Sequence, residues 1–312
     1  AVDRVPYALW RHFHREDSDP EALAEAEVRF FQTYQPDLLK LNPSGWYWVE
    51  ELGVCLERDP RGYSAPQVVA RPITEAIDWT RLKVPRETLN QVAERLLTIE
   101  RIQAGIRSAA PLFETVFSPL TLAYKLAGSR LRDDLEHSRA QAAIARILQD
   151  FSEKIVGYFD ELAARDVAGI FYAVQTASVQ VLSRDQYLTF GLSLDKQILD
   201  QAKKRLRWVI LHLHGESIFF DESISLPYDF LSWHMRETQP SLQEALPRMD
   251  RAILGGVARA TLRTKTPENV RQEVRDALTV THARGIVIAP DCTIHPLAPH
   301  ENLQELVRAA AE

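Results

Sequence analysis

The sequence has too few cysteines for a disulfide-rich secreted protein and no apolar stretch that could cross a membrane. Only Cys55 and Cys292 occur in 312 residues, which favours a reducing compartment. No apolar run approaches the roughly 18 residues of a membrane helix. The segment AVDRVPYALW lacks the basic and apolar regions of a signal peptide. We therefore expect a cytoplasmic protein with no membrane partner.

Basic residues are not in excess either. The 37 lysines and arginines are outweighed by 43 acidic residues, and the net charge of -6 comes without a basic stripe. A nucleic-acid partner is therefore not expected. Glycine-rich phosphate loops are absent, because LGGV at 254–257 lacks the spacing of a dinucleotide-binding fingerprint. What remains is an ordinary globular composition, with 46% hydrophobic and 26% charged residues.

Short apolar runs alternate with long helical stretches along the chain. Eight runs are typical of strands buried on both faces of a parallel sheet, at residues 4–10, 37–42, 111–117, 167–174, 207–214, 228–234, 251–257 and 285–291. Eight strands alternating with helices predict a single (β/α)8 TIM barrel over residues 1–312. No Gly/Ser-rich linker divides the chain.

Helix start signals support this alternation. Asp19 and Pro20 have the N-cap and first-residue positions of one helix, and Thr266 and Pro267 have them in another, with Gly285 beyond its end. Two further segments are longer than a barrel requires. We expect a paired helix at residues 130–164 and an inserted hairpin or loop at residues 55–85.

Polar side chains gather after the predicted strands, where barrels of this kind carry their active sites. Five of the nine histidines lie there, namely His12, His212, His214, His234 and His295. In VILHLHGES at 209–217, the two histidines emerge on the same side of the strand, because successive side chains alternate. This pattern indicates a site, with hydrogen bonding to neighbouring strand ends as the alternative.

Five segments carry a family resemblance. They are VPYALWRHFHR (5–15), SPLTLAYKLAG (118–128), SLQEALPRMDRAILGGV (241–257), TPENVRQEVRDAL (266–278) and GIVIAPDCTIHPLAPHENLQELV (285–307). Together they resemble the uroporphyrinogen decarboxylase superfamily over essentially the whole chain. The resemblance implies a TIM-barrel enzyme and a homodimer. The family includes the heme-pathway decarboxylase and methyltransferases that work with corrinoid proteins and thiols.

Some residues match the decarboxylase pattern. Arg11 and Arg15 keep the spacing of the family's R-Q-A-G-R segment, which contacts substrate carboxylates, and Tyr124 matches the tyrosine of Y-M-V-E-G. Guanidinium groups bind such anions bidentately, so a small acidic or tetrapyrrole-like ligand is expected, with a surface ion-pair network as the alternative. Two elements depart from the pattern. LKLNPSG replaces the acidic F-S-D segment, and Cys292 replaces the histidine of G-H-G.

The methyltransferase pattern accounts for the paired histidines. Those enzymes have a His-x-Cys-Gly segment after the fifth strand and a second cysteine after the eighth, which together bind zinc. HLHG matches with His214 in place of the first cysteine, and Cys292 stands at the second. The resemblance thus implies that His212, His214 and Cys292 bind zinc, with the fourth position open for a thiol or water. A methyl-transfer role would need a separate corrinoid protein.

Other residues at the strand ends complete the predicted site. Catalytic roles are expected for His212, His214, Cys292, Tyr124 and Asp291, the last as a group that orients an imidazole. Substrate contacts are expected from Trp10, Arg11, His12, Arg15, Asn42, Gln175, Trp233 and His234. Three functions stay open. They are zinc-assisted methyl transfer involving a small acidic or thiol substrate, cofactor-free decarboxylation, and non-catalytic binding of a tetrapyrrole or corrinoid.

Overall fold

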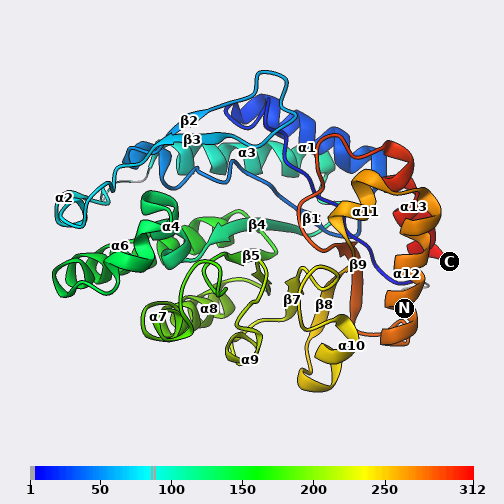
Figure 1. Cartoon of the computed structure of the whole chain (residues 1–312). Helices are drawn as coiled ribbons and strands as arrows, with labels where there is room; N and C mark the ends of the chain where they lie inside the picture. Colours follow the sequence, from blue (N-terminus) through cyan, green and yellow to red (C-terminus); the bar gives the residue numbers. More distant parts are fainter. Residues whose placement is uncertain (1–3, 86, 88) are drawn as a thin grey trace.

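A parallel sheet that curls into a ring forms the centre of the molecule (Figure 1). The structure, a computed structural model, describes residues 4–85, 87 and 89–312. Within these residues, seven strands pair in parallel in the order β1 (Leu39–Lys40), β4 (Leu112–Phe117), β5 (Gly169–Val174), β6 (Trp208–Leu213), β7 (Phe230–Trp233), β8 (Ala252–Val257) and β9 (Ile286–Pro290). These strands confirm seven of the eight predicted runs.

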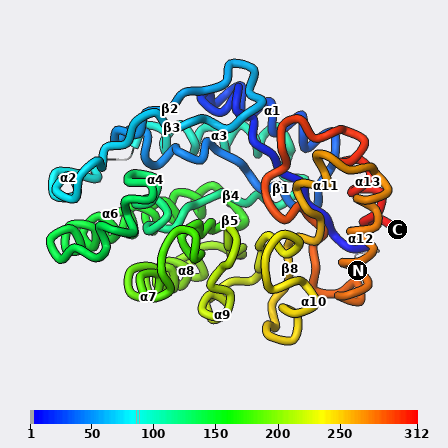
Figure 2. The backbone as a smooth tube through the Cα atoms, in the orientation of Figure 1, coloured from blue at the N-terminus to red at the C-terminus, as the bar shows by residue number. Residues whose placement is uncertain are grey.

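The remaining predicted run, residues 4–10, closes the ring without forming a regular strand. Tyr7 bridges to Ile288 of β9 and Ala8 bridges to Leu38 beside β1, both in parallel. The segment therefore lies between β9 and β1, and Figure 2 shows its blue tube passing there. Pro6 has no N–H to donate, which limits the length of the ladder. The predicted (β/α)8 barrel is confirmed.

Helices surround the ring on its outer face (Figure 1). None of the described helices is both long enough and apolar enough to span a bilayer. The helices are α1 (Pro20–Tyr34), α2 (Asp78–Arg81), α3 (Asn90–Ile106), α4 (Pro119–Ala127), α5 (Arg130–Asp134), α6 (Ser138–Ala164), α7 (Arg184–Tyr187), α8 (Ser193–Arg205), α9 (Phe220–Ser223), α10 (Leu242–Ala245), α11 (Arg259–Thr264), α12 (Pro267–Thr281) and α13 (His300–Ala311). Short 3-10 turns cover Glu50–Leu52 and Leu246–Arg248, and a π-helical turn covers Leu188–Leu192.

The predicted helix starts are confirmed. The Asp19 side chain accepts hydrogen bonds from two backbone N–H groups in the first turn of α1. Thr266 forms a capping box with Asn269 at the start of α12. Such caps satisfy backbone donors that have no partner within the helix. The chain therefore leaves each strand and enters its helix at a residue that local chemistry selects.

Both predicted additions to the barrel are also confirmed. The segment 130–164 forms the paired helices α5 and α6, and the segment 55–85 contains an antiparallel hairpin of β2 (Cys55–Glu57) and β3 (Gln67–Ala70). Arg71, directly after β3, donates a hydrogen bond from Nη1 to the carbonyl of Lys125 in α4. The hairpin is thus attached to the helix that follows β4.

Gly169 lies where strands β5 and β6 approach each other closely. A Cβ added at Gly169 in β5 would lie 2.2 Å from the backbone carbonyl oxygen of Trp208 in β6, so the two strands would have to separate. We expect Gly169→Ala to lower the free energy of unfolding by about 2 kcal/mol. Chemical denaturation measures this change.

Gly157→Ala is the matched control, because Gly157 lies in α6 with no other atom within 4 Å of the added Cβ. Alanine should raise the unfolding free energy there by about 0.5 kcal/mol or more, because glycine loses more backbone entropy in a helix. Equal effects of the two substitutions would contradict the close approach of β5 and β6.

Candidate metal centre

Four side chains with metal-binding atoms meet at the carboxyl ends of the strands. They are His212 in β6, His214 just after β6, His234 just after β7, and Cys292 after β9. One ligand atom from each lies within 4.8 Å of the others. His212, His234 and Cys292 are buried and His214 is partly exposed. The cluster therefore lies at the mouth of the barrel.

Strand geometry explains why three histidines converge. His212 and His214 point to the same side of β6, as their alternation predicts. The parallel register pairs His212 with Ser232 and Leu213 with Trp233 of β7. The next residues along both strands are His214 and His234, and their ring centroids lie 4.7 Å apart.

The hydrogen bonds leave ring nitrogens turned towards Cys292. The Cys292 Sγ lies 4.0 Å from His212 Nε2 and 3.7 Å from His214 Nδ1. On the other side of its ring, His212 Nδ1 lies 3.1 Å from the Ser232 hydroxyl. His234 Nδ1 lies 3.6 Å from a Glu237 carboxylate oxygen. Buried His234 Nε2 has no hydrogen-bond partner among the described residues, so it is available to an occupant of the cluster.

The local electrostatics favours the metal-binding forms of these groups. Burial lowers the pKa of His212 far below its ordinary value, and burial with the charge of Arg259 lowers the pKa of His214 to about 4. Burial opposes ionisation of Cys292, but the nearby His234 and the charge of Arg259 still lower the pKa of the thiol. His212 and His214 are thus neutral near pH 7, with lone pairs free to coordinate a cation.

Three imidazoles and one thiol make a donor set suited to zinc. Nitrogen and sulfur ligands bind zinc well, whereas magnesium and calcium prefer oxygen ligands. The Ser232 hydroxyl would orient the His212 imidazole from behind, as the partners of metal-bound histidines commonly do. The cluster could therefore hold a metal ion such as zinc.

His234 was expected to contact substrate, and its place among the possible ligands was not predicted. The available signal was its position at the end of the sixth predicted run, equivalent to that of His214 at the end of the fifth. Lys40 in β1 was also missed. It is buried, donates a hydrogen bond from Nζ to Asn42, and lies 4.5 Å from the centroid of the Phe171 ring. A lysine inside the apolar run DLLKLN was the signal for it.

Three residues predicted to contact substrate lie near Lys40. Trp10 is buried, with its ring centroid 5.7 Å from Lys40 Nζ. Asn42 is buried and accepts the lysine hydrogen bond through Oδ1. His12 stacks on His14, and burial followed by the charges of His14, Lys40 and Lys125 lowers the pKa of His12 far below its ordinary value. These residues line the β1 side of the mouth.

Other predicted residues do not join the cluster. The Trp233 ring packs against Phe220 and donates from Nε1 to the carbonyl of Pro240, so it faces the helical layer. It points away from the cluster because it alternates with Ser232 in β7. The Asp291 carboxylate accepts hydrogen bonds from the backbone N–H groups of Gly256 and Arg236, instead of from an imidazole.

Gln175 and Tyr124 belong to the β5 and β4 sides of the barrel. The Gln175 backbone N–H donates to the Thr121 hydroxyl at 2.9 Å, which ties the end of β5 to α4. Tyr124 is partly buried in α4. Burial lowers the pKa of the neighbouring Arg71 guanidinium, and Tyr124 opposes this shift. Both residues keep their proposed roles as predictions.

The two predicted anion-binding arginines occupy different surroundings. The Arg11 guanidinium lies over the Phe13 ring at 5.1 Å, and its Nε is buried without a partner among the described residues. Arg15 is exposed, and its backbone packs against Gly62 in the hairpin loop. Their four-residue spacing therefore does not direct both side chains to the cluster.

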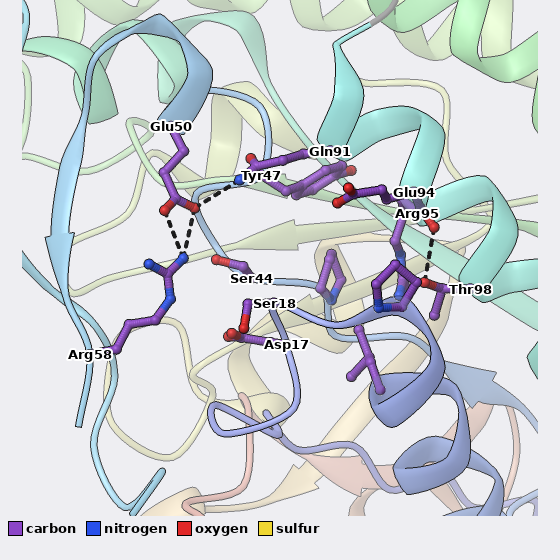
Figure 3. A pocket seen from close by; sticks show the side chains of 13 residues that line it. Asp17, Ser18, Ser44, Tyr47, Glu50, Arg58, Gln91, Glu94, Arg95 and Thr98 are labelled. Atoms are coloured by element: carbon purple, nitrogen blue, oxygen red, sulfur yellow. Dashed lines mark hydrogen bonds and ion pairs between the residues drawn. The ribbon is translucent and has the colours of Figure 1, made fainter. Parts of the chain in front are cut away.

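A separate, small polar pocket lies between the loop after β1 and helices α1 and α3 (Figure 3). Its walls carry an ion pair between Arg58 and Glu50 with 2.7 Å between Nη2 and Oε1. Gln91 Oε1 and Arg95 Nη1 in its walls are buried without a hydrogen-bond partner among the described residues. The lining includes no histidine or cysteine, so this pocket is distinct from the metal centre.

Comparison with known protein families identifies the barrel. The family model described as uroporphyrinogen decarboxylase (URO-D) matches residues 10–312. The chain belongs to the uroporphyrinogen decarboxylase family. This membership confirms the resemblance seen in the sequence, and it identifies an enzyme rather than a non-catalytic barrel.

Sequence comparison detects a decarboxylase and a methyltransferase as relatives. A uroporphyrinogen decarboxylase from Synechococcus sp. is 24% identical over 308 residues, which cover 94% of this chain and 81% of the relative. The methylcobamide:CoM methyltransferase MtbA from Methanosarcina acetivorans is 22% identical over 249 residues, which cover 78% of this chain and 71% of the relative. Family membership thus identifies an enzyme that is a decarboxylase or a methyltransferase.

Solved structures share the fold. A methyltransferase from Methanosarcina mazei superimposes with a TM-score of 0.83 at 20% identity, covering 99% of this chain and 94% of that chain. A B12-independent methionine synthase from Shewanella sp. W3-18-1 gives a TM-score of 0.64 at 15% identity, covering 99% and 93% of the two chains. These likenesses support the barrel described above.

Zinc content tests the cluster directly. Protein purified without chelator or histidine tag and then reconstituted should retain about one zinc per chain. Cys292→Ser should retain less than about 0.2 equivalents while the barrel still folds, because it removes the one thiolate of the set. Elemental analysis and circular dichroism measure the two quantities.

Cys55→Ser is the matched control, since Cys55 is the exposed cysteine in β2. It should retain zinc as the wild type does. Equal losses in the two variants, or a wild type that binds less than about 0.2 equivalents, would contradict metal binding by this cluster.

Proposed function

We propose that this protein is a zinc-assisted methyltransferase that methylates a small thiol, with a methylated corrinoid on a separate protein as the methyl donor. The cluster of three histidines and one cysteine at the barrel mouth carries this proposal. The relative MtbA supports it, because its name describes methyl transfer from a methylcobamide to CoM. The fold shared with a solved methyltransferase is consistent with it.

His212, His214 and Cys292 would hold the zinc. When bound, the ion would supply positive charge that lowers the pKa of a coordinated thiol, so that the nucleophilic thiolate is present at neutral pH. Ser232 would keep the His212 ring oriented through Nδ1, because that hydroxyl lies 3.1 Å away. Three protein ligands leave a position for the substrate sulfur.

His234 would accept the proton that the substrate thiol releases. Its Nε2 has no partner among the described residues and its ring lies beside that of His214, so it faces the position that the sulfur would take. The Glu237 carboxylate, 3.6 Å from Nδ1, would stabilise the imidazolium that forms. A methylated corrinoid on a partner protein would supply the methyl group and would keep the electron pair of the broken cobalt–carbon bond, while His234 holds the thiol proton.

Decarboxylation of a carboxylated substrate is the second candidate. The sequence match with the Synechococcus decarboxylase favours it, because that match covers 94% of this chain. In this case Arg11 would bind a substrate carboxylate and Tyr124 would lie near the reacting carbon, with no metal required. Uroporphyrinogen turnover by metal-free protein distinguishes this reaction from methyl transfer.

Methyl transfer is tested with methylcobalamin and the neutral thiol 3-mercapto-1-propanol. The zinc-loaded wild type should demethylate methylcobalamin, which its change in absorbance follows, and form the methyl thioether. His234→Ala should keep its zinc but lower the rate roughly 100-fold, because a positioned general base contributes at least that factor. Cys292→Ser should lose zinc and rate together.

The methyl-transfer assay has a control variant and two outcomes that would contradict the proposal. His137→Ala changes an exposed histidine outside the cluster and should leave the rate unchanged. Stable methylcobalamin with zinc-loaded wild type would contradict the proposal, and uroporphyrinogen turnover by the same protein would replace it with decarboxylation.

A further inference from the structure

Lys125 is a buried lysine for which the described residues provide no acidic partner. It lies in α4 and only 7% of its surface is exposed. Its Nζ forms no hydrogen bond and no ion pair with any described residue, and rings of Trp46 and Phe117 flank it with centroids 4.5 Å away on each side. Burial of an unpaired ammonium is costly, so such a group is unusual unless an anion joins it.

A second cation lies on the same aromatic ring. The Arg71 guanidinium is 5.6 Å from the centroid of Trp46 and donates a hydrogen bond to the backbone carbonyl of Lys125. Arg71 likewise forms no ion pair with a described acid. Two positive charges therefore share one aromatic side chain without compensation.

Two other cations near the mouth, Arg259 and Lys40, have acidic or polar partners. Arg259 forms an ion pair with Glu237 at 3.2 Å. Lys40 is hydrogen-bonded to Asn42, and burial lowers its pKa to about 7 although nearby Cys292, Glu27 and Glu114 raise it. Burial and the charge of Arg71 also lower the pKa of Lys125 to about 7, with no acid to oppose them.

The charge of Lys125 affects residues in and around the metal cluster. Its charge contributes to lowering the pKa of His214 and of His12, which lie on two different sides of the mouth. Gly45, in the loop after β1, faces the ammonium: a Cβ added there would lie 3.9 Å from Lys125 Nζ. The ammonium therefore lies beside the loop after β1 and the end of the hairpin, near enough to the mouth for its charge to act on His214 and His12.

We propose that Lys125 and Arg71 bind the carboxylate of the substrate, and that the substrate is a short, thiol-bearing organic acid whose apolar part lies against Trp46. This inference rests on the proposed thiol methylation for the role of the substrate sulfur. It assigns the acid group to a different place from Arg11 and Arg15. A carboxylate beside two cations and an aromatic face would neutralise the buried charge, and charge-assisted hydrogen bonds would hold it.

The test uses 3-(methylthio)propionate, a carboxylate without a free thiol, so that binding does not depend on zinc. Metal-free wild type is titrated by calorimetry and by tryptophan fluorescence, with Trp46→Phe to identify the signal of Trp46. Lys125→Met keeps the length of the side chain between the two rings and removes its charge. It should weaken binding about tenfold or more, because hydrogen bonds to charged groups contribute on that scale.

Lys196→Met is the matched control, since Lys196 is exposed in α8, and it should bind as the wild type does. The neutral analogue 3-(methylthio)propan-1-ol should bind the wild type more weakly than the acid does. It should bind Lys125→Met as tightly as it binds the wild type. Undetectable binding of the acid, equal affinity for acid and alcohol, or unchanged affinity in Lys125→Met would each overturn the subsite. Methyl transfer to neutral 3-mercapto-1-propanol is judged separately, so the two proposals fail independently.

Discussion

The parallel register between β6 and β7 is the constraint on which the metal centre depends. It pairs His212 with Ser232, which fixes the first imidazole through a hydrogen bond, and it brings His214 beside His234 one residue beyond the pairing. A shift by one residue would turn these side chains to the helical layer, where Trp233 now packs. Close approach of β5 and β6 at Gly169 holds the same strands in place.

Charge at the barrel mouth is arranged unevenly. The imidazoles of His212 and His214 are held neutral by burial, and Arg259 is paired with Glu237, so this side is ready for a cation. On the side formed by α4 and the hairpin, Lys125 and Arg71 lie on the Trp46 ring and have no acidic partner among the described residues. One end of a bound molecule would thus meet the metal ligands and the other end would meet cations.

The family barrel supports more than one chemistry because the reacting groups lie at the strand ends, while the ring of strands supplies the frame. Here Cys292 stands where the decarboxylase pattern has a histidine, and LKLNPSG, which contains β1 and the loop after it, stands where that pattern has an acidic segment. Cys292 places a sulfur atom within 4.0 Å of ring nitrogens of His212 and His214.

By itself, the sequence determined the strands, the helix caps and the same-side placement of His212 and His214, because period-two alternation and capping are local. Its family resemblance also identified Cys292. Only the tertiary structure decided that His234 joins the cluster, that Trp233 turns away, and that Asp291 bonds to backbone N–H groups. It also decided that Lys125 and Arg71 share Trp46, since segments 54 residues apart meet there. Such meetings depend on strand register and ring closure, which residue periodicity does not encode.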